Sequence, residues 1–168
     1  MLNERDKRTY QKMGNPDLKE MKEYGLKELN RFLHDIGDPK GKYKVYKNKL
    51  VAICLCQGAA KHILDGKSGI KDIDIWLFFR DDVNVKIPDI KNMRYTKWGS
   101  FTRIGKKRMD FMKKGIRDNI INKAKSKKPD DILYSYLRNS KTLTSKELAQ
   151  KAVIGLYPEK IFGKVIWP

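Results

Sequence analysis

Apolar residues recur along the chain with two different periods, which predict its helices and strands. Between residues 15 and 36 they return every three or four positions, which is typical of an amphipathic helix. Asn15-Pro16-Asp17 provides a helix start, and Gly37-Asp38-Pro39 provides a stop. We therefore expect a scaffold helix over this segment.

The next part of the chain has the pattern of a sheet. Residues 50–56 (LVAICLC) are almost entirely apolar, which is typical of a buried strand, and Gln57-Gly58-Ala59-Ala60 ends this run. The elements expected after it are a short helix at 59–64, a loop at 65–69, and strands at 72–79, 101–104 and 107–112.

Helical signals return near the C-terminus. Asp130 or Asp131 begins one helix, and Thr144-Ser145-Lys146-Glu147 has the pattern of a capping box for another. Strands followed by helices predict an α/β (α+β) fold, with a mixed β-sheet flanked by an N-terminal helix and a C-terminal helical segment.

The length of 168 residues matches one ordinary domain. We expect a single domain over 1–168, with its core at about 43–115 and a C-terminal helical extension at about 129–168. Apolar residues make up 40% of the chain and charged residues 35%, which allows a core beneath a polar surface.

Several features of the sequence favour a cytoplasmic location. No run reaches the ~18 consecutive apolar residues of a membrane helix, and the first residues lack the apolar stretch of a signal peptide. Cys54 and Cys56 lie two apart in an apolar run, a spacing unlike that of zinc ligands, so we interpret them as reduced core residues. We expect no membrane association.

The basic charge is concentrated in one segment. The formal net charge is +18, and residues 86–128 contain fifteen Lys or Arg against three Asp. Such an excess attracts polyanions, of which nucleic acid is the leading candidate, ahead of substrate phosphates or an acidic protein. The alternative is a solvated basic surface with no specific partner.

Three carboxylates form a candidate metal site. Side chains alternate along a strand, so Asp72 and Asp74 share one face, and their mutual repulsion is costly unless a cation lies between them. Asp110 faces away from its buried neighbours, and an antiparallel pairing of the two strands brings all three acids together. Magnesium binds carboxylate oxygens and substrate phosphates, so we expect Mg²⁺, or Mn²⁺ in its place, as the cofactor. The alternative for Asp72 and Asp74 is a pair of exposed caps.

The turn before these acids suits a phosphate, because Gly58 allows close approach and the following helix directs amides towards an anion. Gly58-Ala59, twelve further residues, Asp72-Ile73-Asp74 and the later Asp110 together resemble the nucleotidyltransferase superfamily, of the DNA polymerase β-like, minimal type. The resemblance covers roughly residues 50–113. The family usually has serine or glycine at the position of Ala59.

The resemblance implies roles for these residues. Asp72 and Asp74 would ligate the catalytic metals, Asp110 would ligate one metal and help to activate the acceptor hydroxyl, and Gly58 would contact the triphosphate. Ala59 would belong to the same nucleotide-binding turn, without the phosphate-binding hydroxyl.

Other side chains near the motif have two interpretations each. Lys61 and Lys67 are candidate nucleotide-binding residues or solvated lysines, and His62 is a phosphate contact or a packing residue. Trp76 and Phe78 share the face of the acids, where they line a substrate pocket or pack beneath a later segment.

We therefore expect a metal-dependent nucleotidyltransferase that moves a nucleoside monophosphate from a nucleoside triphosphate to a hydroxyl and releases pyrophosphate. The basic segment favours RNA, such as tRNA, or another nucleic acid as the acceptor. One alternative is a catalytically inactive nucleic-acid-binding protein with the same fold, and another is a toxin- or antitoxin-type partner protein. The nucleotide, the acceptor and the oligomeric state stay open.

Overall fold

A computed structural model describes residues 7–34, 41–87 and 97–168 of the chain. Within these residues, six strands form one mixed sheet in the order β3-β4-β2-β1-β5-β6. The strands are β1 (Leu50–Cys56), β2 (Ile73–Arg80), β3 (Lys97–Phe101), β4 (Lys107–Ile116), β5 (Val153–Tyr157) and β6 (Val165–Trp167). The helices are α1 (Asn15–His34), α2 (Gln57–Asp65), α3 (Asp118–Ile121), α4 (Pro129–Asn139) and α5 (Leu143–Ala149), with 3₁₀ turns η2 (Lys42–Tyr46) and η4 (Glu159–Ile161). The predicted mixed sheet flanked by helices is confirmed.

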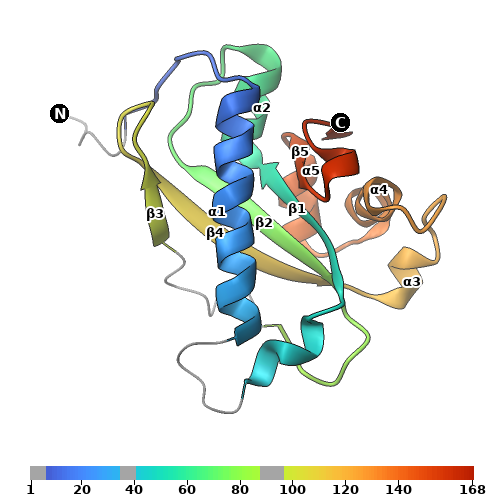
Figure 1. Ribbon diagram of the computed structural model, residues 1–168. Helices are drawn as coiled ribbons and strands as arrows, with labels where there is room; N and C mark the ends of the chain where they lie inside the picture. The colour runs from blue at the N-terminus through green and yellow to red at the C-terminus, as the bar shows by residue number, and fades with distance from the viewer. Residues whose placement is uncertain (1–6, 35–40, 88–96) are drawn as a thin grey trace.

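The two faces of the sheet build separate apolar clusters, because neighbouring side chains on each strand point in opposite directions. On one face, α1 and α2 cover residues such as Ile53, Ile75 and Phe111. On the other face, α4 and α5 cover residues such as Cys54 and Phe78. Figure 1 shows α1 lying along the sheet, with α4 and α5 towards the C-terminal side of the molecule.

Helix α1 begins close to where its sequence pattern predicts. The Gly14 backbone amide donates to the Asp17 carboxylate at 2.9 Å, so the helix start lies one residue earlier than expected. Where α1 crosses β1, a Cβ on Gly25 would come within 2.8 Å of Ile53 Cγ2, and glycine therefore permits the close approach. The predicted stop at Gly37-Asp38-Pro39 lies outside the described residues.

The C-terminal part of the chain combines helices with strands. The capping-box prediction at residues 144–147 is wrong, because Thr142 caps α5 by accepting a hydrogen bond from the Ser145 amide at 3.2 Å. After α5 the chain adds β5, which pairs with the central strand β1, and then β6. The sequence pattern did not assign these two short strands.

The two cysteines are free and fully buried, as expected, and both belong to the cluster beneath α4. Burial raises the pKa of each thiol, which keeps it protonated and unreactive. Among the helices that the structure describes, none has the length and apolar character that crossing a membrane requires.

Candidate active site

The three predicted acids lie on the same face of the sheet. Asp74 and Asp110 are directly opposite each other on the neighbouring strands β2 and β4. Residues opposite each other on paired strands project to the same side, and strand alternation adds Asp72 two positions before Asp74. The antiparallel pairing considered as a way to bring the acids together does not occur, because β2 and β4 run parallel. The acids still meet, since the register places Asp74 beside Asp110.

The proximity of the acids changes their ionisation. The pKa of Asp74 is raised from 3.8 to about 7 by burial, and then by the negative charges of Asp110 and Asp72. Arg108 and Lys151 oppose this shift with positive charge. A carboxylate under such repulsion gains from an additional cation, so the electrostatics of this site favour cation binding.

Arg108 brings a positive charge to the acids. Its Nη2 lies 2.8 Å from Asp110 Oδ2 and 3.6 Å from Asp72 Oδ2, and its Nε donates to Asp110 Oδ2 at 2.9 Å. Arg108, two residues before Asp110 on β4, therefore bridges two of the acids. In this arrangement, no three His, Cys, Asp or Glu side chains of the described residues are grouped to hold a metal ion.

The predicted phosphate turn adjoins the acids. Cys56, the last residue of β1, is directly opposite Asp74, so α2 begins beside that carboxylate. Gln57 then adopts a positive φ of 65°, which is unfavourable for a residue with a side chain and is a form of strain that collects at functional sites.

The space around Gly58 is open. A Cβ added there would meet no atom within 4 Å, and the first-turn amides of a helix have no acceptor within the helix. Ala59 is fully buried in the cluster beneath α1, so it offers a phosphate only its backbone amide.

The other predicted contacts separate into structural and solvent-exposed residues. His62 is buried: its Nδ1 accepts from the Gly69 amide at 3.1 Å, which leaves Nε2 protonated to donate to the Gln11 carbonyl at 3.0 Å. This is the packing role. Lys61 and Lys67 are exposed, and among the described residues both interact with Asp65.

Two cations near the acids were not assigned roles from the sequence. Arg108 was counted only as part of the basic segment, although its position two residues before Asp110 on a strand places it on the same face. Lys151 is about 80 residues from Asp74 along the chain, yet it approaches because Ala152 accepts a hydrogen bond from the Gln57 amide at 3.2 Å. No local sequence signal indicates that Lys151 lies near Asp74.

Trp76 and Phe78 both pack beneath α4, which is one of the two roles considered for them. Phe78 packs against Tyr136 of α4 with ring centroids 5.7 Å apart, and Trp76 stacks on Phe78 at 6.1 Å. Trp76 also lines a cavity that continues along the acid-bearing face.

No protein-family model, curated protein or solved structure matches the chain.

Proposed function

We propose that the protein is a metal-dependent nucleotidyltransferase. In this reaction an acceptor hydroxyl oxygen attacks the α-phosphorus of a nucleoside triphosphate, the bond to the β-phosphate oxygen breaks, and pyrophosphate leaves. The observation that carries the proposal is the pairing of Asp74 with Asp110, with Asp72 on the same face and the start of α2 alongside.

The donor set suits magnesium or manganese, because both ions bind carboxylate oxygens. Asp72, Asp74 and Asp110 would hold the metal, whose positive charge would stabilise the negative charge that develops on the phosphoryl group. The raised pKa of Asp74 supports this assignment, since a bound cation would lower the cost of ionising it. Arg108 has to release Asp72 and Asp110 before all three carboxylates can face one ion.

The remaining residues of the site position the substrates. The amides of Gly58 and Ala59 are in place to donate to the triphosphate, and the open space at Gly58 allows its approach. Lys151, and Arg108 once it leaves the acids, supply positive charge for phosphate oxygens. Asp110 is the carboxylate that would accept the hydrogen bond of the attacking hydroxyl.

Incorporation of labelled nucleotide into total RNA tests the proposal. We expect magnesium-dependent incorporation by the unaltered protein and a loss of about 100- to 1000-fold in Asp74→Asn, because charge stabilisation in the transition state is removed. Asp82→Asn is the matched control, since Asp82 pairs with Lys49 beyond the other end of β2. Equal incorporation by Asp74→Asn and the unaltered protein would contradict the proposal.

A second candidate is a non-catalytic nucleic-acid-binding protein with this fold. The specific observation in its favour is Arg108, which already neutralises part of the acid cluster without a metal. Calorimetry with magnesium and each nucleoside triphosphate separates the candidates. Binding that disappears in Asp74→Asn supports the enzyme, whereas no binding at millimolar magnesium supports the second candidate.

A further inference from the structure

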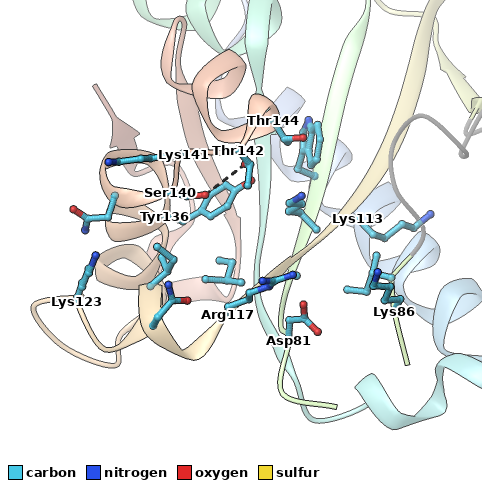
Figure 2. Close-up of a pocket in the computed structure, with 18 of the residues that line it drawn as sticks. Asp81, Lys86, Lys113, Arg117, Lys123, Tyr136, Ser140, Lys141, Thr142 and Thr144 are labelled. Atoms are coloured by element: carbon cyan, nitrogen blue, oxygen red, sulfur yellow. Dashed lines mark hydrogen bonds between the residues drawn. The ribbon is translucent and has the colours of Figure 1, made fainter. Parts of the chain in front are cut away.

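A cavity of about 1040 Å³ opens between the end of β4 and the helices that follow it. Figure 2 shows side chains from several segments around the cavity: Asp81 and Lys86 follow β2, Lys113 and Arg117 come from the end of β4 and the next residue, and Lys123 follows α3. The others come from Tyr136 of α4 and from the residues that lead into and begin α5. Small-molecule sites usually measure about 300 to 1000 Å³, so this cavity can hold more than a single small ligand.

The cavity continues the surface that carries the acids. Beyond the opposed acids Asp74 and Asp110, the next residues on the same face are Trp76, opposite Met112, and then Phe78, opposite Lys114. Trp76 and Lys114 line the cavity. The four residues from Asp110 to Lys114 span roughly 13 Å at about 3.3 Å per residue, so ligands at the two places would be neighbours.

The wall of the cavity is strongly basic. Among the described residues that line it, Asp81 is the only carboxylate, and Lys113 is paired with Glu28. The cations that line it with no carboxylate partner among the described residues are Lys42, Lys86, Lys114, Arg117, Lys123 and Lys141. They come from separate segments of the chain, a distribution that suits several phosphates rather than one.

Two aromatic residues of the wall have unsatisfied polar atoms. Trp76 Nε1 and the Tyr136 hydroxyl are buried without a hydrogen-bond partner among the described residues. Thr142 lies near the hydroxyl, but the geometry between them is not that of a hydrogen bond. Buried polar groups normally have partners, so a ligand or water that enters this region can complete their hydrogen bonding.

We propose that the cavity binds the single-stranded nucleic-acid end that receives the nucleotide, an inference that rests on the proposed function. The cations of the cavity have no carboxylate partner among the described residues and lie beyond the acids, so they offer a surface for a second anion beside the triphosphate. Positive charge along a concave surface is typical of single-strand binding sites, because it follows the phosphate backbone, and the buried Trp76 and Tyr136 contribute polar atoms to the wall rather than exposed ring faces.

Anisotropy of a labelled single-stranded RNA tests this assignment with Lys114→Ala/Arg117→Ala. We expect binding to weaken about tenfold or more, and the dependence of log affinity on log salt to become shallower by about one to two units, because up to two phosphate contacts are lost. The matched control is Lys19→Ala/Lys160→Ala, which removes the same charge from exposed positions outside the cavity lining. It should bind RNA like the unaltered protein.

Binding of other polyanions shows which class of polymer the cavity accepts. Single-stranded DNA of the same sequence shows whether the sugar is recognised, and a duplex and poly-glutamate test single-strand and nucleic-acid selectivity. Equal weakening in the cavity and control variants, or equally tight binding of poly-glutamate or duplex, would overturn the inference.

The two proposals can fail separately. Asp74→Asn should lose incorporation yet keep RNA binding, and the cavity variant should bind RNA more weakly yet keep magnesium-dependent nucleotide binding in calorimetry. If the unaltered protein incorporates no nucleotide, the proposed function fails, while RNA binding lost only in the cavity variant still supports the site. If the cavity variant binds RNA as tightly as the unaltered protein does, the cavity assignment fails and the proposed function stands.

Discussion

On the α1 face of the sheet, Lys113 Nζ lies 2.5 Å from Glu28 Oε1, and both side chains are about 5% exposed. On the opposite face, three carboxylates lie together, those of Asp72, Asp74 and Asp110, and Arg108 contacts two of them, Asp72 and Asp110. The first cluster has matched charges, which suits a role in structure. In the second, burial and the charges of Asp110 and Asp72 raise the pKa of Asp74, and a carboxyl group perturbed in this way is the better indication of a ligand site.

The matched pair can be broken from one side. Glu28→Ala should lower the free energy of unfolding by about 3 to 5 kcal/mol, because the Lys113 ammonium stays buried without its partner. Urea unfolding at neutral pH measures the change, with Glu23→Ala, an exposed acid on the same helix, as the control. Glu28→Leu/Lys113→Met should recover most of the loss. A single-variant loss below about 1 kcal/mol would show that the pair is not a structural element.

The free energy of unfolding should fall as pH rises through the range in which Asp74 ionises. An ordinary salt-bridged acid has the opposite effect, because its ionisation stabilises the folded protein. Since the folded pKa of Asp74 is about 7 against an ordinary 3.8, its ionisation costs stability as pH rises between these values. Asp74→Asn avoids that cost, so its advantage in unfolding free energy over the unaltered protein should grow from little at pH 4 to about 4 kcal/mol above pH 7.

The same comparison tests cation binding. Millimolar magnesium should reduce the advantage of Asp74→Asn at pH 8 by stabilising the unaltered protein, and it should leave the variant unchanged. Thermal or urea unfolding at several pH values measures both effects. A constant difference between the two proteins across this pH range would contradict the raised pKa of Asp74.

The smallest effect on stability is expected at Gly58. Gly58→Ala introduces a Cβ into open space and favours the helix, so the free energy of unfolding should change by less than about 1 kcal/mol, in the stabilising direction. Triphosphate affinity should fall about tenfold as the methyl group obstructs the phosphate, which calorimetry measures. Gly25→Ala is the contrasting variant, because its Cβ would contact Ile53 across the α1 face and lower stability instead. Unchanged triphosphate affinity in Gly58→Ala would remove the turn from the site.

Sequence periodicity was sufficient for the central elements, because alternation along a strand is a local property. It predicted β1 and β2, the N-terminal part of β4, and the shared face of Asp72 and Asp74. It did not predict β5, which is short and has no distinctive boundary, although this strand pairs with the centre of the sheet.

The sequence by itself determined which residue types were available: apolar strands, three acids at strand positions that alternate with apolar residues, a glycine turn and a strong excess of positive charge. Tertiary structure decided which of them meet. The parallel register of β2 and β4 sets Asp74 beside Asp110, and the same packing brings in Arg108 and the distant Lys151. Strand direction and register depend on contacts between segments far apart in the chain, and local patterns carry little information about such contacts.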